Sequence, residues 1–168
     1  MSSSCFVLLG MPGCGKSTLG EALAARLGLA FMDTDEVLSA RVGRDLNAHL
    51  NDVGDDVFLR DEEDAVCAVQ AENTVIATGG SVVYSDRAMT HLKALGMCVY
   101  LEVEADRVRQ RIEGSAVRPI VAFEHKNVNM LWKERDALCR TYADYVISNN
   151  TTPEEALQKL DMLRKKKR

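Results

Sequence analysis

Short apolar runs alternate with longer amphipathic segments along the chain. The runs Cys5–Leu9 (CFVLL) and Thr74–Ala77 (TVIA) are uniformly apolar or nearly so, which predicts buried strands. Similar runs stand at Ala30–Met32, Met97–Leu101 and Tyr145–Ile147. Between them, apolar residues three or four positions apart predict helices over Ser17–Leu27, Asp55–Gln70, Arg87–Leu95, Ala105–Ile112 and Val128–Tyr142.

This alternation of strands and crossover helices predicts an α/β fold, with a mostly parallel sheet covered on both faces. A chain of 168 residues suits one domain, residues 1–168. Thr152 as N-cap, Pro153 in the first turn and the acidic pair Glu154 and Glu155 predict a C-terminal helix over 153–167. The final RKKKR favours a solvated helix end over a nucleic-acid or membrane patch.

Composition narrows the class of protein. Hydrophobic residues make up 46% and charged residues 27% of the chain, which is typical of a folded globular enzyme. A net charge of −4 gives no reason to expect nucleic acid as the main partner. We find neither a signal peptide nor an apolar run near the ~20 residues that span a bilayer, so we expect a cytoplasmic protein without a membrane partner. The five cysteines lack CxxC spacing, which argues against a disulfide framework or a zinc site.

The strongest chemical signal is GMPGCGKS, which matches the phosphate-loop pattern GxxxxGK[ST] between a predicted strand and a predicted helix. Gly10, Gly13 and Gly15 allow the backbone to curl so that its amides face phosphate oxygens. Lys16 is expected to reach the β- and γ-phosphates, and the Ser17 hydroxyl to bind Mg²⁺. A glycine-rich turn without a ligand is the alternative, and the full motif disfavours it.

A second group of carboxylates follows the next predicted strand, in the sequence FMDTDE. At strand spacing Asp33 and Asp35 would point the same way, toward the ligand crevice at the carboxyl ends of the strands. One carboxylate can support Mg²⁺, and the other can accept a proton from an attacking hydroxyl. Alternatively, Thr34 or Asp35 only caps the following helix.

Two further motifs allow both a functional and a plain structural interpretation. In ATGGS, Gly79 and Gly80 would let a ligand approach bare backbone amides, or would form a tight turn without chemistry. In SAVRP, Arg118 precedes a proline in a loop-like segment, which suits a lid over phosphates but also an ordinary surface arginine.

Taken in order, GMPGCGKS, DTD, VGDDVF, TGG, VRP and ERDAL resemble the shikimate kinase family over nearly the whole chain. The resemblance implies a three-layer P-loop kinase fold with a five-stranded parallel sheet and a mobile lid at about 113–126. It further implies phosphorylation of the 3-hydroxyl of shikimate, with ATP and Mg²⁺ as cofactors.

Carried over residue by residue, the resemblance assigns three overlapping sets of side chains. The nucleotide set is Gly10, Gly13, Cys14, Gly15, Lys16, Ser17, Thr18 and Arg111, with Ser17 and Asp33 at the metal. The substrate set is Asp35, Phe58, Leu59, Gly79, Gly80, Ser81, Arg118 and Arg135. Lys16, Asp35 and Arg118 are the implied catalytic residues, with Asp35 as base and Arg135 pairing with the substrate carboxylate.

Several positions depart from the family pattern on the substrate side. Leu59 stands where an arginine usually completes a carboxylate clamp after the phenylalanine. Arg60 does not easily replace it, because one step along a helix turns the side chain by about 100°. Ser81 replaces a third glycine, Cys139 a common tyrosine and Leu50 a larger ring. We expect a pocket altered where it grips the substrate, with the phosphate-binding residues intact.

Three functions therefore compete. The first is shikimate kinase with a weakened or rebuilt carboxylate grip. The second is a kinase of the same fold acting on another small hydroxylated metabolite, such as homoserine or a polyol. The third is a nucleotide-binding regulatory module without transfer activity, which the intact Lys16, Ser17 and Asp35 disfavour. In the first two cases the partner is a small molecule, and we expect a monomer.

Overall fold

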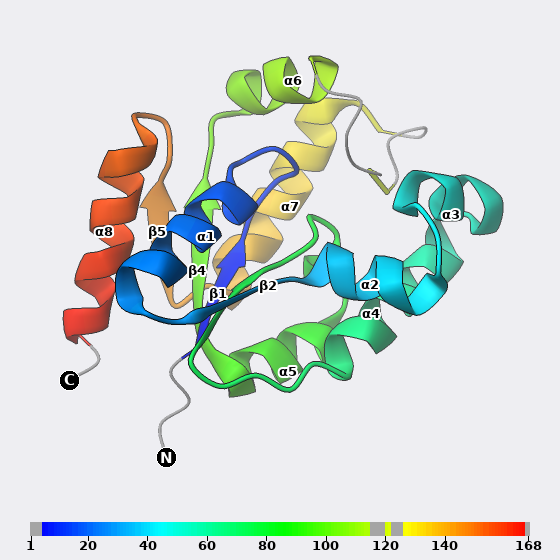
Figure 1. Ribbon diagram of the computed structural model, residues 1–168. Helices are drawn as coiled ribbons and strands as arrows, with labels where there is room; N and C mark the ends of the chain where they lie inside the picture. The colour runs from blue at the N-terminus through cyan, green and yellow to red at the C-terminus, as the bar shows by residue number, and fades with distance from the viewer. Residues whose placement is uncertain (1–4, 115–119, 122–125, 167–168) are drawn as a thin grey trace.

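The structure is a computed structural model that describes residues 5–114, 120–121 and 126–166. Within these residues one parallel sheet contains β1 (Cys5–Leu9), β2 (Ala30–Asp33), β3 (Thr74–Ala77), β4 (Gly96–Glu102) and β5 (Tyr145–Ser148). The strand order is β2-β3-β1-β4-β5, so β1 lies in the centre (Figure 1). Val7 of β1 pairs with Ile76 of β3 and Cys98 of β4. The predicted α/β class and five-stranded parallel sheet are confirmed.

Helices connect the strands as predicted, with three additional helical segments. The predicted helices appear as α1 (Lys16–Leu27), α4 (Asp55–Cys67), α5 (Asp86–Leu95), α6 (Ala105–Glu113), α7 (Val128–Tyr142) and α8 (Pro153–Lys166). The additional segments are α2 (Thr34–Val42), α3 (Leu46–Val53) and the short 3-10 helix η1 (Val82–Tyr84). Of these, only α2 was considered from the sequence, as the helix that Thr34 or Asp35 would cap. Helix α4 also ends before the predicted Gln70. The Glu155 amide donates to Thr152 Oγ1 over 3.3 Å, which confirms the predicted cap of α8.

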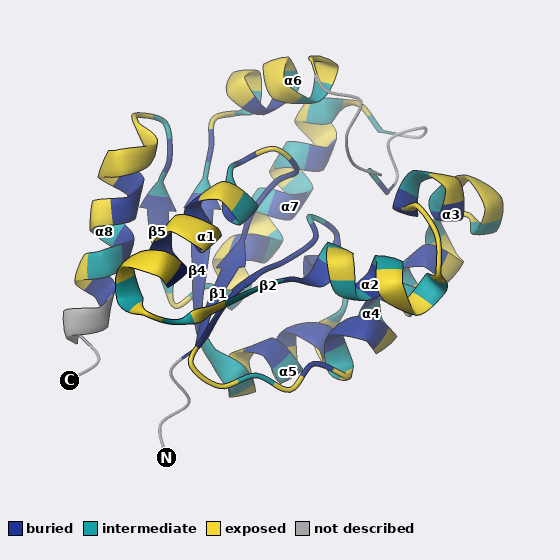
Figure 2. Ribbon diagram, in the orientation of Figure 1, coloured by how far each residue is buried: buried dark blue, intermediate teal, exposed yellow. Residues whose placement is uncertain are grey.

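Alternate residues of the central strand face opposite layers. Phe6 and Leu8 join a core that includes side chains of α1 and α8, whereas Val7 and Leu9 join a core with side chains of α5. Figure 2 shows the buried central strands β1 and β3 between these partly exposed helices. This is the three-layer arrangement that the alternating pattern predicts.

The unpredicted helices form a third, smaller core. Leu38 of α2, Leu46 of α3 and Phe58 of α4 are buried together, and Figure 1 shows these three helices side by side. This core packs α2, α3 and α4 together, and α2 follows directly from the end of β2. No helix in the described part of the chain has the length and apolar character needed to cross a bilayer.

Candidate functional site

The GMPGCGKS segment forms a tight loop between β1 and α1. Gly10, Gly13 and Gly15 have φ values of 154°, 72° and 96°, which strain most side chains. A Cβ at Gly10 would also lie 2.6 Å from Cys14 Sγ and 2.9 Å from the Leu101 carbonyl oxygen. The loop therefore requires glycine for both conformation and space, and it leads into the amino terminus of α1, where free amides favour anions.

Lys16, the first residue of α1, is 4% exposed and turns its ammonium group into this loop. Its Nζ donates to the carbonyl oxygens of Gly10 at 2.7 Å and Met11 at 2.9 Å. These bonds satisfy a buried charge, which would otherwise be costly. The ammonium is thus held against the loop backbone, where a phosphate chain cradled by the loop would meet it.

Two distant segments hold the loop from outside. Arg111 at the end of α6 donates to the Gly13 carbonyl oxygen over 2.7 Å. Asn149, just after β5, donates through Nδ2 to the Cys14 carbonyl oxygen over 2.8 Å. The structure thus brings Arg111 to the loop, whereas the Cys14 side chain is fully buried beneath it and the Thr18 side chain is exposed.

Ser17 and Asp33 form the expected hydroxyl and carboxylate pair. The Ser17 hydroxyl donates to Asp33 Oδ2 over 2.6 Å, and Asp33 is 4% exposed. Hydroxyl and carboxylate oxygens are ligands that suit Mg²⁺, and they lie at the amino terminus of the helix that follows the phosphate loop. The residues present therefore fit a magnesium ion at this position.

The prediction that strand spacing makes Asp33 and Asp35 point the same way is wrong. Strand β2 ends at Asp33, and Asp35 lies in the first turn of α2, so strand spacing does not relate them. Asp33 also caps α2, because its Oδ1 accepts from the Asp35 amide over 2.9 Å. The capping alternative named Thr34 or Asp35, whereas the capping residue is Asp33.

The Asp35 carboxylate instead faces the TGG turn, defined here as Thr78–Gly80. A Cβ at Gly79 would lie 2.7 Å from Asp35 Oδ1 and 2.3 Å from Glu62 Oε1. Two carboxylates from different helices thus approach the same bare backbone position. The absence of a side chain at 79 allows both carboxylates to lie in these positions.

Gly80 connects this carboxylate pair to the phosphate loop. A Cβ at Gly80 would lie 2.8 Å from Pro12 Cδ in the loop and 3.1 Å from a guanidinium nitrogen of Arg135. The TGG turn is therefore in close contact with the phosphate loop on one side and with an arginine on the other. This is the arrangement expected where a phosphate donor and a second molecule meet.

Glu62 is the most unusual titratable group near the turn. Burial raises the pKa of its carboxyl to about 7, opposed by a hydrogen bond from Ser81, with a further raising effect from Asp35. The Ser81 hydroxyl donates to Glu62 Oε2 over 2.6 Å. A pocket of about 120 Å³ adjoins this pair and is lined also by Leu59, Arg60 and Tyr84. Arg60, expected to turn away, is exposed and borders this pocket.

Arg135 of α7 is 1% exposed, and its guanidinium points into the protein. It donates to the Val121 carbonyl oxygen over 2.9 Å and to the Tyr84 hydroxyl over 3.3 Å. The guanidinium carbon also lies 5.3 Å from the centre of the Tyr84 ring. These contacts set the direction of the one buried guanidinium found among the described residues.

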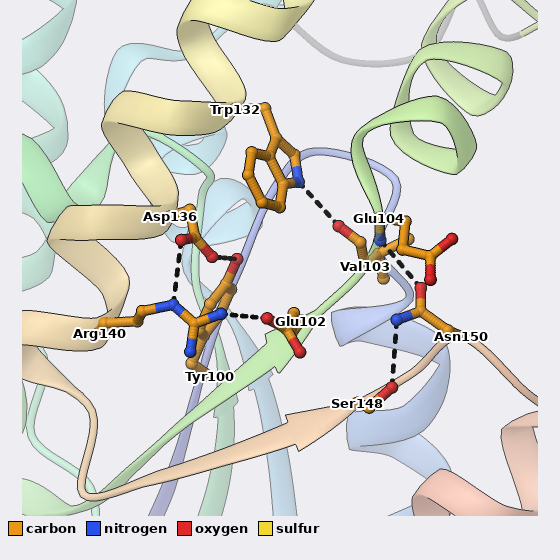
Figure 3. Close-up of polar contacts among 9 residues, drawn as sticks. All are labelled: Tyr100, Glu102, Val103, Glu104, Trp132, Asp136, Arg140, Ser148 and Asn150. Carbon is orange, nitrogen blue, oxygen red and sulfur yellow. Dashed lines mark hydrogen bonds and ion pairs between the residues drawn. The ribbon is translucent and has the colours of Figure 1, made fainter.

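Polar contacts on another face of α7 hold this helix to the sheet (Figure 3). Asp136 accepts from the Tyr100 hydroxyl over 2.8 Å and from Arg140 Nε over 3.0 Å, and Arg140 also pairs with Glu102. Trp132 Nε1 donates to the Val103 carbonyl oxygen over 2.8 Å. Because Tyr100, Glu102 and Val103 lie in or next to β4, this network fixes the helix that carries Arg135.

The remaining predicted residues lie in different surroundings. Phe58 is 3% exposed within the third core, and Leu59 is partly buried at the edge of that core. Arg118 lies outside the described residues, as does much of the segment 113–126 predicted as a lid.

Sequence reasoning missed Glu62 and Tyr84 and gave Asn149 no role. Glu62 stands in the acidic run DEED, which looks like an exposed helix face. Its position three residues after Leu59, on the same side of a helix, is the signal that would have singled it out.

Comparisons with known proteins agree with this geometry. The family model described as shikimate kinase matches residues 12–163. The shikimate kinase of Paracidovorax citrulli is 36% identical over 146 residues, which cover 84% of this chain and 80% of that protein. That of Francisella tularensis subsp. novicida is 33% identical over 147 residues, covering 85% and 84%.

Solved structures show the same likeness. The shikimate kinase of Acinetobacter baumannii in complex with shikimate superimposes with a TM-score of 0.83 at 26% identity, covering 100% of this chain and 96% of that one. The shikimate kinase of Aquifex aeolicus gives a TM-score of 0.81 at 26% identity, with 94% of each chain covered. Together with the family model, these matches show that the chain belongs to the shikimate kinase family.

Proposed function

We propose that this protein is a shikimate kinase, which transfers the γ-phosphoryl group of ATP to the 3-hydroxyl of shikimate. One observation carries the proposal: Gly79 and Gly80 lie in close contact with Pro12 of the phosphate loop, with the Asp35 carboxylate and with the Arg135 guanidinium. A nucleotide in the loop and an anionic alcohol beside the TGG turn would then be neighbours.

The nucleotide side of the site uses charge and backbone together. Members of this family use ATP with Mg²⁺. The loop amides and Lys16 would hold the phosphates, Arg111 would cover the loop, and Ser17 with Asp33 would hold the metal ion. When bound, Mg²⁺ supplies positive charge beside the phosphate oxygens. The Lys16 ammonium, now on the Gly10 and Met11 carbonyls, needs only a local change of partners to reach the phosphates.

The acceptor side uses Asp35 and Arg135. Asp35 would accept the proton of the attacking hydroxyl and hold that hydroxyl in line with the phosphoryl group. Arg135 is buried and offers several N–H groups in one plane, which suits a carboxylate. An acceptor with a hydroxyl near Asp35 and a carboxylate near Arg135 fits this pair.

Charge stabilisation completes the proposed mechanism. In phosphoryl transfer negative charge develops on the equatorial oxygens, so positive groups fixed in advance accelerate the reaction. Lys16 is held beside the phosphate loop by the Gly10 and Met11 carbonyl oxygens, so its charge lies close to where the phosphates would bind. Arg118 is proposed to add a second positive charge when the 113–126 segment closes, which would also exclude water and limit ATP hydrolysis.

A second candidate acceptor is supported by Leu59. The pocket beside Glu62 presents a leucine where an arginine would otherwise contribute to a carboxylate clamp. A kinase for another small hydroxylated metabolite, such as homoserine or a polyol, would fit a pocket with fewer positive charges. In either case we propose a monomeric cytoplasmic enzyme.

A coupled ADP-release assay with a panel of acceptors separates these functions. ADP release that depends on shikimate supports the first proposal, and release only with homoserine, another hydroxy acid or a sugar supports the second. Nucleotide binding without release for any acceptor would contradict both and indicate a module without transfer activity.

A further inference from the structure

Two departures from the family pattern, Leu59 and Ser81, meet at one buried group. Leu59 and Glu62 are three residues apart on α4, and both line the pocket that Ser81 also lines. Ser81 is 6% exposed and Glu62 is 4% exposed. An arginine at position 59 would therefore lie on the same helix face as the Glu62 carboxylate, within reach of it.

Glu62 has no cation as a direct partner in the described part of the chain. Its neighbouring acids on α4 are turned elsewhere: Asp61 pairs with His49, and Glu63 pairs with Arg87. Among the described residues, the Glu62 carboxylate has one hydrogen bond, which comes from the Ser81 hydroxyl over 2.6 Å. Ser81 thus supplies a hydrogen bond where a salt bridge from position 59 is missing.

The charged groups that face Glu62 come from three other elements. Asp35 of α2 opposes its negative charge, whereas Arg135 of α7 and Lys16 of α1 favour it, all without direct contact. Among the described residues no ion pair joins Glu62 to Arg135, although both lie against the TGG turn. Keeping these two groups apart leaves the guanidinium available to an anionic acceptor.

We propose that Ser81 is a positioning residue that takes over the role of the cation missing at position 59. Its hydroxyl holds the Glu62 carboxylate at the turn after β3 and away from Arg135. Serine in place of the family's glycine at position 81 and leucine in place of its arginine at position 59 then form one linked change.

The charge state of Glu62 gives this linkage a pH dependence. A hydrogen bond or ion pair to a charged carboxylate is stronger than one to the neutral acid. Because burial raises the pKa of Glu62 to about 7, the carboxyl is mostly neutral at pH 5 and mostly ionised at pH 8. The contribution of Ser81 should therefore be larger at pH 8.

The test is a double-mutant cycle of Ser81→Ala and Leu59→Arg in the full chain, measured by chemical unfolding at pH 5 and pH 8. At pH 8 we expect Ser81→Ala to lower the folding equilibrium constant by roughly tenfold or more, and by less at pH 5. Leu59→Arg should recover most of this loss when combined with Ser81→Ala and give less benefit when Ser81 is present. Ser81→Thr keeps the hydroxyl, and its added methyl group can enter the adjoining pocket. Its unfolding equilibrium should therefore match that of the parent protein at both pH values.

The effect on the acceptor rests on the proposed function and is measured separately. Ser81→Ala should raise the KM for shikimate severalfold and leave the KM for ATP and kcat nearly unchanged. Additive unfolding effects that are equal at both pH values, or an equal loss with Ser81→Thr, would overturn the role of Ser81. Coupled unfolding effects in a protein that never turns over shikimate would support that role and reject the proposed function.

Discussion

The Ser17 hydroxyl donates to the Asp33 carboxylate over 2.6 Å, which joins the start of α1 to the end of β2. Asp33 at the same time caps α2 through the Asp35 amide. One carboxylate thus connects the proposed metal site to the helix that carries the proposed base. We expect a change at the proposed metal ligands to raise the Mg²⁺ concentration that activity requires more than it changes substrate affinity.

Removal of the Ser17 hydroxyl tests the metal site. Ser17→Ala should raise the Mg²⁺ concentration needed for half-maximal activity by roughly tenfold or more, because a ligand that suits Mg²⁺ is lost. Titration of Mg²⁺ at saturating ATP measures this. Ser17→Thr, which keeps the hydroxyl, should leave the requirement almost unchanged, and an equal rise in both variants would argue against a ligand role.

An arginine at position 59 should strengthen the grip on shikimate. A charge-assisted hydrogen bond contributes ~1.5–3 kcal/mol, so Leu59→Arg should lower the KM for shikimate by roughly ten- to a hundredfold. The KM for ATP should not change. Leu59→Met, which keeps the site neutral, is the matched control, and the same improvement with methionine would show that charge is not the cause.

Neutralising Asp35 should affect turnover more than nucleotide binding. Asp35→Asn removes the proposed base but leaves the phosphate loop in place, so kcat should fall by roughly a hundredfold or more. Steady-state kinetics and ATP binding by calorimetry measure the two effects. Equal losses of turnover and ATP affinity would contradict the assigned role.

Arg135 should act on the acceptor alone. Arg135→Ala should raise the KM for shikimate by roughly a hundredfold, because it removes the buried donor proposed for the carboxylate. Lys133→Ala removes an exposed cation from the same helix and should have little effect. A circular dichroism melt checks folding, since Arg135 also binds the Val121 carbonyl oxygen. A folded Arg135→Ala protein with an unchanged KM would exclude this contact.

Glu62 should make the stability of the protein depend on pH. Burial raises the pKa of its carboxyl from 4.5 to about 7, so the folded state binds the proton more tightly than the unfolded state. Stability should therefore fall as the pH rises from about 4.5 to 7, by about 3 kcal/mol at most. Glu62→Gln should lack this contribution. Unfolding midpoints measured from pH 4.5 to 8 check this, and parallel curves for the two proteins would contradict it.

The sequence predicted most of the sheet and the phosphate loop because both depend on local pattern. The run Cys5–Leu9 followed by GMPGCGKS allows few other structures, since the glycines tolerate positive φ and the next segment has helical spacing. The region after β2 was harder. Asp33 ends a strand and caps a helix at once, so a strand pattern was extended over residues that belong to α2.

The acceptor side of the site could be predicted only in part. Leu59 and Ser81 stood out as departures from a family pattern, but their meeting at Glu62 depends on the packing of α4 against the turn after β3. Asn149 and Arg111 reach the phosphate loop from distant segments, and chain spacing does not reveal such contacts.

The most direct test of the proposed reaction is phosphorus NMR of the product formed from ATP and shikimate. We expect a new phosphomonoester signal, coupled to the proton on the 3-carbon of shikimate, that grows as ADP forms. The Asp35→Asn protein should give almost none of it. Inorganic phosphate alone, or ATP that stays unchanged with shikimate but reacts with another alcohol, would contradict the assignment of shikimate as the acceptor.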